Sequence, residues 1–365
     1  MRIKGKHFRS IWKEGNCIKI IDQRCLPYEL KIVELDNLEE FSFAIKEMQV
    51  RGAPLIGVTA AYGIAKSIDK DPSDENLLKT CETLAKTRPT AINLFWAINL
   101  LKKELLNTNI EERINKAIGL ADSIADDDIS NNEMIGINGA KILKEYAGNQ
   151  NKSIINVLTH CNAGWLATVD RGTALSPIFK ARDEGLNIHV WVDETRPRNQ
   201  GCLTAWELEN EEIEHTVIVD NAGGHLMQTG LIDIVIVGSD RTSLNGDVCN
   251  KIGTYLKALS AKDNNIPFYA ALPISTIDRE IENGLEIPIE NRSNLEVKNV
   301  RGLDSNQNIT EINLYPNENT KLLNPAFDVT PAKLVTGIIT DKGVCLPQKK
   351  EIIKLLNNGE KIELE

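Results

Sequence analysis

Beyond residue 153 the sequence alternates short apolar runs with segments of helical periodicity, and this alternation constrains the fold more than any other feature. The apolar runs are rich in Val and Ile, as is typical of strands buried on both faces. Strands that alternate with helices form parallel sheets, because each crossover helix packs back onto the sheet. Strands are predicted at 154–159, 187–192, 216–219, 232–237, 266–271 and 335–340, with helices near 172–185, 202–209, 221–229, 248–263 and 330–334.

The first 147 residues have a different pattern. Residues 17–35 are predicted to form two short strands around a proline turn, and five amphipathic segments follow them. The polar segment 148–153 (GNQNKS) predicts a boundary. We therefore expect a small N-terminal α+β domain, mostly helical with a short β region, at 1–147 and a parallel-sheet α/β domain at 148–365. The amphipathic segments are Leu38–Val50, Leu55–Ile68, Ile92–Leu106, Ile110–Ala125 and Asn132–Tyr146, and residues 283–323 are predicted to be a long loop with a short strand.

Composition excludes several classes of protein. The formal charge of -10 disfavours a nucleic-acid surface. The absence of an apolar run near the roughly 20 residues of a membrane span predicts no membrane insertion. Seven scattered cysteines without a C-x-x-C pair predict free thiols in a reducing cytoplasm, and the N-terminal MRIKGKHFRSIW has no apolar signal core. The five histidines lack metal-ligand spacing, so no metal is predicted.

Chemically capable residues follow four of the predicted strands. In an open parallel sheet, ligands bind outside the carboxyl ends of the strands, so we expect these residues to share a cleft. A thiol and a carboxyl group placed there can exchange protons with a substrate. The four strand ends carry Cys161 and Asn162; Asp193, Glu194 and Arg196; Asp220 and Asn221; and Asp240 and Arg241.

Each of these residues also has a structural interpretation. A cysteine is often a core residue, but Cys161 lies in HCNAGW, which is typical of a tight turn. Asp240 serves equally well as a helix cap or as a catalytic group. Asp193 and Glu194 with Arg196 favour an internal ion pair, and His160 is expected to be packed or hydrogen-bonded. Cys202 and Cys249 are expected to be structural helix residues.

Three cationic elements lie beside predicted turns. Arg51-Gly52-Ala53-Pro54 and Arg88-Pro89-Thr90 each precede a helical segment, and Asn250-Lys251 follows the Asp240 loop. A helix N-terminus with a guanidinium group is a ready anion site. Each Arg alone could be a surface ion-pair partner, but together the three elements indicate a phosphorylated small molecule. The chain has neither G-x-x-x-x-G-K-[ST] nor G-x-G-x-x-G, so no motif supports a nucleotide site.

Eight motifs, in order from about residue 20 to residue 340, resemble the methylthioribose-1-phosphate isomerase family. That family is homologous to the regulatory subunits of the translation-initiation guanine-nucleotide exchange factor. The resemblance implies a Rossmann-like C-terminal domain, a homodimer, and no metal or organic cofactor. It also implies an aldose-ketose isomerase that converts 5-methylthio-D-ribose 1-phosphate to 5-methylthio-D-ribulose 1-phosphate in methionine salvage. The motifs are MQVRGAPLIGVTAAYG, RPTAINLFWA, LTHCNAG, VDETRPRNQG, LTAWEL, VGSDR, NGDVCNKIGTY and NPAFDVTPAKL.

The resemblance also assigns roles to residues of this chain. Cys161 and Asp240 match the family's catalytic pair. Asp240 would protonate the ring oxygen, and Cys161 would act as the base or stabilise the transition state. The positions that match the family's substrate-binding residues are Arg51, Gly52, Ala53, Arg88, Gln200, Asn250 and Lys251.

Three motifs depart from the family pattern, so the reaction type is better supported than the C5 substituent of the sugar. The family's LATAGYGTAL, DETRPLLQG and DSMAAYLM are LATVDRGTAL, DETRPRNQG and DNAGGHLM here. A 5-deoxyribose 1-phosphate substrate, from 5-deoxyadenosine salvage, is one alternative. Ribose 1,5-bisphosphate would need a further cationic site, and a non-catalytic regulatory subunit of the same fold is the alternative outside enzymes. The departures are expected beside the cleft and add Asp170, Arg171, Arg198, Asn199 and His225.

Overall fold

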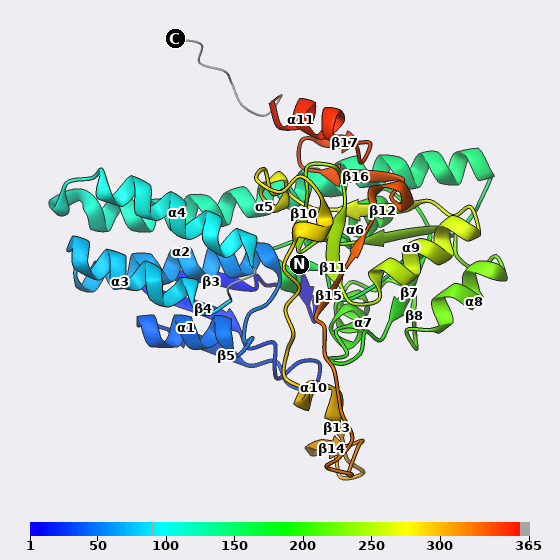
Figure 1. Cartoon of the computed structure of the whole chain (residues 1–365), viewed down its shortest axis with the longest axis horizontal. Coiled ribbons are helices and arrows are strands. Elements are labelled where there is room, and N and C mark those ends of the chain that lie inside the picture. The colour runs from blue at the N-terminus through cyan, green and yellow to red at the C-terminus, as the bar shows by residue number, and fades with distance from the viewer. Residues whose placement is uncertain (89–90, 358–365) are drawn as a thin grey trace.

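The computed structural model describes residues 1–88 and 91–357. Helices of the first part of the chain lie on one side of the molecule and a large sheet lies on the other (Figure 1). The N-terminal strands pair antiparallel, and the two strands expected in 17–35 are confirmed as β4 and β5. These N-terminal strands are β1 (Arg2–Ile3), β2 (Lys6–His7), β3 (Ile11–Glu14), β4 (Cys17–Ile21) and β5 (Ile32–Leu35).

The N-terminal helices pack around α2 (Ala53–Lys70), which is buried along most of its length. Small residues on α2 allow close approach, because a Cβ on Gly57 would lie 2.8 Å from the Asn93 carbonyl oxygen of α4. α3 was not predicted; its apolar stripe of Leu77, Cys81 and Leu84 spans only two turns. The other helices of this group are α1 (Leu38–Lys46), α3 (Asp74–Ala85) and α4 (Ile92–Leu106).

The helix α5 (Ile110–Gln150) corrects two expectations. Residues 110–125 and 132–146 belong to one helix, because the intervening DDDISN contains no Gly or Pro that would interrupt it. The helix also continues past residue 147 and ends at Gln150, where Asn151 adopts the left-handed conformation. Its first half packs with α2 and its second half with α6 and the sheet, so α5 runs along both parts of the molecule (Figure 1). The division at residue 147 stays a prediction.

The large sheet has seven strands in the order β17-β16-β12-β9-β6-β7-β8, and all neighbours are parallel except β16 and β17. This confirms the α/β class, since the six parallel strands follow the Rossmann order 3-2-1-4-5-6. The chain moves outward from β6 in one direction and returns at β9 to move in the other. The strands are β6 (Ile155–Thr159), β7 (Ile188–Asp193), β8 (His215–Ile218), β9 (Ile234–Val237), β12 (Phe268–Ala271), β16 (Gly337–Thr340) and β17 (Gly343–Cys345).

Smaller elements surround this sheet. The helix expected at 248–263 begins only at Thr254, because residues 248–251 form a strand of a second sheet with the order β10-β11-β15. Cys249 is therefore a strand residue, whereas Cys202 lies in a helix as expected. The segment 283–323 contains a hairpin rather than one strand, and 332–334 is a 3₁₀ turn. These elements are α6 (Ser176–Asp183), α7 (Gly201–Asn210), α8 (Ala222–Gln228), α9 (Thr254–Asp263), α10 (Leu295–Lys298), α11 (Lys349–Asn357), β10 (Arg241–Thr242), β11 (Val248–Lys251), β13 (Asn299–Leu303), β14 (Ile309–Asn313) and β15 (Phe327–Thr330).

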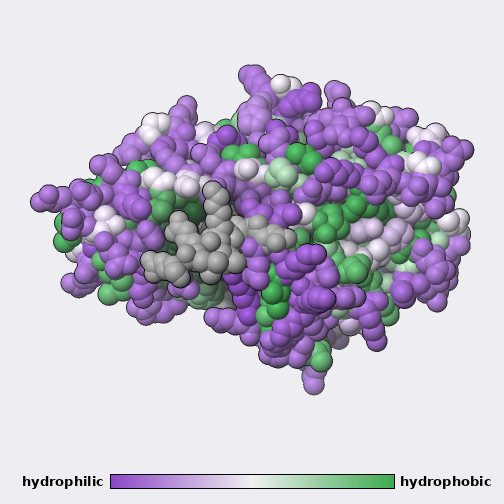
Figure 2. All heavy atoms as spheres, turned by 90° about the horizontal axis from the view of Figure 1, so that it is seen from above, coloured by the Kyte–Doolittle hydropathy of each residue, from purple (hydrophilic) through white to green (hydrophobic). Residues whose placement is uncertain are grey.

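The surface agrees with the charged composition. The face in Figure 2 is mostly hydrophilic, and its hydrophobic side chains gather over the half of the molecule that holds the sheet. Within residues 1–88 and 91–357, every helix is too short or too polar to span a bilayer.

Glycine on α5 sets how closely α6 approaches, which yields a stability test. A Cβ on Gly139 would lie 2.4 Å from the Cγ of Pro177, whereas Gly119 of the same helix faces open space. Gly139→Ala should lower the free energy of unfolding by about 1–3 kcal/mol through overpacking. Gly119→Ala should raise it by up to about 1 kcal/mol because alanine favours the helix. Urea unfolding measures both, and a stabilising Gly139→Ala would contradict this packing.

Candidate active site

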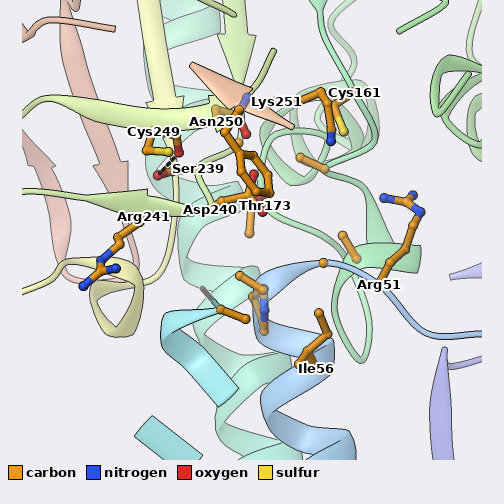
Figure 3. Close-up of a pocket in the computed structure, with 18 of the residues that line it drawn as sticks. Arg51, Ile56, Cys161, Thr173, Ser239, Asp240, Arg241, Cys249, Asn250 and Lys251 are labelled. Atoms are coloured by element: carbon orange, nitrogen blue, oxygen red, sulfur yellow. Dashed lines mark hydrogen bonds between the residues drawn. The ribbon is translucent and has the colours of Figure 1, made fainter. Parts of the chain in front are cut away.

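The two candidate catalytic side chains lie at the carboxyl ends of neighbouring strands. Cys161 follows β6 and Asp240 follows β9, and these are the strands between which the chain reverses direction across the sheet. Loops diverge at such a point and leave a crevice. Figure 3 shows the side chains of Cys161, Asp240 and Lys251 around one cavity. Asp240 caps no described helix; its amide N–H instead donates to the Cys249 carbonyl oxygen at 3.0 Å.

All nine candidate residues line this cavity, although they come from distant parts of the sequence. The N-terminal helices contribute the start of α2 and the residue before the Pro89-Thr90 segment, which lies outside the described residues. The sheet domain contributes the loops after β6, β7 and β9. The nine are Arg51, Gly52, Ala53, Arg88, Cys161, Gln200, Asp240, Asn250 and Lys251.

The backbone at Cys161 is held in a strained conformation. Its φ of +70° lies in the left-handed region, which costs a residue other than glycine on the order of 1–3 kcal/mol. Two threonines hold this conformation in place. The Cys161 N–H donates to Thr195 Oγ1, and Thr204 Oγ1 donates to the Cys161 carbonyl oxygen, both at 2.8 Å. The thiol is thereby directed into the cavity (Figure 3).

A buried hydrogen-bond chain orients the next residue, Asn162. Its Oδ1 accepts from Arg51 Nη2, and its Nδ2 donates to Glu207 Oε1 at 2.7 Å. Glu207 also accepts from the backbone N–H of Trp165 at 2.8 Å, and burial raises the pKa of this carboxyl group to about 7. This chain therefore fixes the Arg51 guanidinium group against the loop that carries Cys161.

Positive charge gathers on one side of the cavity. Lys251 is buried, and its Nζ lies 4.8 Å from the centre of the Phe327 ring. Arg88 has an Nη2 that lies 3.8 Å from Glu290 Oε2, while its Nε is buried without a hydrogen-bond partner among the described residues. Sequence reasoning missed Arg292, which also lines the cavity, because it belongs to the irregular segment without a motif.

The N-terminus of α2 completes this cationic side. No side chain caps the helix, and its N-cap residue Gly52 has a φ of +96°. A Cβ there would lie 2.3 Å from the Ala167 carbonyl oxygen, so only glycine fits. Free helix N–H groups beside guanidinium and ammonium groups form an anion site of the kind that binds phosphate.

Burial shifts the pKa values of both candidate catalytic groups. Removal from water raises the pKa of the Asp240 carboxyl group, and the cations Lys251, Arg88, Arg292 and Arg51 oppose that rise. Burial likewise raises the pKa of the Cys161 thiol, and Lys251 and Arg51 oppose it. Burial therefore favours a protonated Asp240, which is the form that a general acid requires.

Two of the four strand ends do not contribute to the cavity. The residues at or directly after the ends of β7 and β8, namely Asp193, Glu194, Arg196 and Asp220, are not in its lining, and the loop after β7 reaches the cavity only later, through Gln200. The expected ion pair of Asp193 and Glu194 with Arg196 is also wrong. Asp193 pairs with His160 and Lys257, and Arg196 donates to the carbonyl oxygens of residues 197 and 297.

The departures from the family pattern leave the cavity lining unchanged. Asp170 accepts a hydrogen bond from the Met1 amino group at 2.6 Å, in a separate pocket that it shares with Arg171. Arg198 pairs with Glu296 at 2.8 Å. The expectation that these residues lie beside the cleft holds for Arg198 and Asn199. Both line an adjoining hollow, which shares Arg51 and Gln200 with the cavity. The residues outside the cavity lining are Asp170, Arg171, Arg198, Asn199 and His225.

Comparisons with known proteins agree with this architecture. The model of the initiation factor 2 subunit family matches residues 49–347. The chain belongs to this family. A relative from Escherichia coli O45:K1 (strain S88), named methylthioribose-1-phosphate isomerase, is 53% identical over 96% of this chain and 95% of its own length.

Two solved structures of the family resemble the chain along nearly its full length. The Pyrococcus horikoshii 5-methylthioribose 1-phosphate isomerase has a TM-score of 0.82 and 40% identity over 97% of both chains. A structure from A. fulgidus, described as translation initiation factor eIF-2B subunit delta, has a TM-score of 0.80 and 40% identity over 96% of this chain and all of that one.

A matched substitution at a second glycine, Gly15, distinguishes the cost of the close contact at Gly52 from the cost of backbone strain. Gly15 also has a positive φ, +62°, but nothing lies within 4 Å of its added Cβ. Gly15→Ala should cost about 1–2 kcal/mol of unfolding free energy from strain alone. Gly52→Ala adds an overlap with Ala167 and should cost about 1–3 kcal/mol more. Chemical denaturation of both variants tests this, and equal losses would argue against the close approach.

Proposed function

We propose that this protein is an aldose-ketose isomerase that converts 5-methylthio-D-ribose 1-phosphate to 5-methylthio-D-ribulose 1-phosphate. The observation that carries the proposal is one cavity holding a half-buried thiol, a half-buried carboxyl group and a cluster of cations at the end of a parallel sheet. Relatives more than half identical over nearly the whole chain carry the same activity in their names. We place the reaction in methionine salvage and in the cytoplasm.

The substrate chemistry accounts for the two catalytic groups. The phosphate on the anomeric oxygen prevents ring opening by loss of a hydroxyl proton, so an acid must protonate the ring oxygen while its bond to C1 breaks. Asp240 is suited to this step because burial favours its protonated form. Hydrogen must then move from C2 to C1, either as a proton through an enediol or as hydride, and the C2 hydroxyl group must lose its proton to form the ketone, which balances the proton given to the ring oxygen. Cys161 lies in the same cavity, where it acts as the base or stabilises the transition state.

The cationic side of the cavity would hold the phosphate. The uncapped N-terminus of α2 offers backbone N–H groups, and Arg51, Arg88 and Lys251 offer positive charge beside it. Gln200 has a buried Oε1 with no hydrogen-bond partner among the described residues, so it is available for a sugar hydroxyl group. Gly52, Ala53 and Asn250 complete the proposed substrate-binding set.

Substitution of the two catalytic groups provides the direct test. Asp240→Asn removes the acid and Cys161→Ser removes the thiol, and each should lower kcat by about 10²–10⁴-fold. Exposed residues of the same types serve as controls, and Asp263→Asn and Cys17→Ser should turn over at the wild-type rate. The assay follows ketose formation by proton NMR in deuterated water, with 5-deoxyribose 1-phosphate as the competing substrate. Deuterium at C1 would indicate the enediol route.

Other results would change the proposed function of the protein. Faster turnover of 5-deoxyribose 1-phosphate would change the substrate. Absence of turnover with both sugars would favour ribose 1,5-bisphosphate and then a regulatory subunit, the class named for the A. fulgidus structure. Near wild-type turnover by either variant would remove that residue from the mechanism.

The acid role of Asp240 predicts the direction of the pH dependence. A general acid is active only while protonated, so kcat/KM should be highest below the pKa of Asp240 in the free enzyme and fall as pH rises through it. Because burial raises this pKa, the fall should occur at a higher pH than an exposed aspartate would give. A pH profile of kcat/KM measures this, and a profile that instead rises with pH would contradict the assignment.

We also propose a homodimer. α9 carries exposed apolar side chains at Tyr255, Leu256 and Leu259, and the edge strand β8 exposes Val217. Exposed apolar side chains that gather on one element, as they do on α9, are typical of association sites. Light scattering should give twice the chain mass, and Leu256→Asp should shift the protein to the monomer. A monomeric wild-type protein would contradict the proposal.

A further inference from the structure

Behind the cavity, His160 forms a buried hydrogen-bond cluster that the reaction scheme above does not use. The residue lies between β6 and Cys161, and its side chain is 1% exposed. Its Nδ1 lies 2.8 Å from Asp193 Oδ2, and its Nε2 lies 2.8 Å from the Ile252 carbonyl oxygen. Both ring nitrogens therefore face oxygen acceptors.

These contacts restrict the protonation state of the ring. A carbonyl oxygen can only accept, so Nε2 must carry a hydrogen. A carboxylate also accepts, and Lys257 Nζ lies 3.3 Å from the same Asp193 oxygen, which favours the ionised carboxylate. Nδ1 must then carry a hydrogen too. A neutral imidazole has one N–H and cannot satisfy both contacts.

The surrounding charges support the same assignment. Three carboxyl groups face the ring region: Asp193 on β7, Asp220 after β8, and Asp328 on β15. Asp220 accepts from the backbone N–H of residues 195 and 196, and Asp328 accepts from those of 253 and 255. Lys257 on α9 is the balancing cation, and its Nζ donates to the Asp220 carbonyl oxygen. A charged His160 brings this cluster closer to neutrality.

The position of Lys257 also bears on metal binding. Ligand atoms of His160, Asp193 and Asp220 lie within 4.8 Å of one another, a spacing that could hold a cation. The Lys257 ammonium group already lies 3.3 Å from the Asp193 carboxylate and donates to the Asp220 backbone carbonyl oxygen, so it supplies positive charge there. The cluster is therefore better described as a hydrogen-bonded brace.

The brace joins the Cys161 loop to the end of β11. His160 immediately precedes Cys161, and Ile252 immediately follows Lys251. The ring is closely enclosed, because a Cβ on Gly253 would lie 3.0 Å from its Cε1. The hydrogen bond from Nε2 to Ile252 thus ties the strained Cys161 loop to the end of β11, which carries Lys251.

We propose that His160 is an imidazolium ion at neutral pH and a positioning residue that fixes Cys161 relative to Lys251. The positioning role rests on the proposed isomerase function, whereas the protonation state does not.

The protonation state is tested in the full-length wild-type protein labelled with ¹⁵N-histidine. Two-bond ¹H–¹⁵N spectra at pH 7 should show His160 with two protonated ring nitrogens. His160→Gln assigns the signals, and if this variant does not fold, replacing the other four histidines in turn assigns them by elimination. A His160 ring with one unprotonated nitrogen would overturn the proposal.

The positioning role is tested by kinetics of folded His160→Gln. A misplacement of about 1 Å can cost about 10²-fold in rate, so kcat should fall by up to that factor while the far-ultraviolet spectrum is unchanged. The pH profile of the Cys161 alkylation rate should also change in this variant. His215→Gln, a half-buried histidine outside the cavity, should leave both unchanged. Wild-type kcat and an unaltered alkylation profile in His160→Gln would overturn the positioning role. A wild-type enzyme inactive on every sugar phosphate would instead refute the isomerase proposal and leave the protonation result intact.

Discussion

The site depends on the parallel pairing of β6 with β9. From β6 the chain builds the sheet toward β7 and β8, and from β9 it builds toward β12 and β16. The loops that leave the two central strands must therefore separate, and the crevice between them receives Cys161 from one strand and Asp240 from the other. Strand order thus places an acid and a thiol opposite each other without any local motif joining them.

The second constraint is that a charged ligand needs cations to balance its charge when it leaves water. The N-terminal part of the chain supplies some of these, since Arg51 and the start of α2 reach the cavity from outside the sheet, and Lys251 of β11 adds to them. The long helix α5 packs against both groups of elements and holds them together (Figure 1). Burial raises the pKa of Asp240 and Cys161, while the cations limit that rise. In the proposed reaction, proton transfer and phosphate binding would therefore be electrostatically linked.

The sequence predicted those features that depend on local pattern. The six parallel strands were located to within about two residues, because continuous β-branched runs have few alternatives. All nine candidate residues line one cavity. They could be named from the sequence because the motifs that resemble the family mark individual positions, which hydrophobic periodicity does not. Periodicity failed where long-range pairing decides the structure: residues 248–251 resemble the start of a helix but pair with β15.

Other features had no sequence signal. Arg292 reaches the cavity from an irregular segment, and the left-handed conformation of Cys161 depends on Thr195 from a later loop and on Thr204 of α7. Position at the end of a strand predicted too many site residues. The sequence does not give the order of strands in the sheet, so it cannot tell that the crevice lies beside β9 rather than β7. Asp193 was expected to pair with Arg196 and instead contacts His160 and Lys257, since those partners come from distant elements.

The most direct test of the account is a crystal structure of the protein with 5-methylthio-D-ribulose 1-phosphate. The account predicts the phosphate against the N-terminus of α2, in contact with Arg51, Arg88 or Lys251. It also predicts C1 and C2 of the sugar between the Cys161 thiol and the Asp240 carboxyl group. A sugar phosphate bound outside this cavity, or bound with C1 and C2 away from both groups, would contradict it.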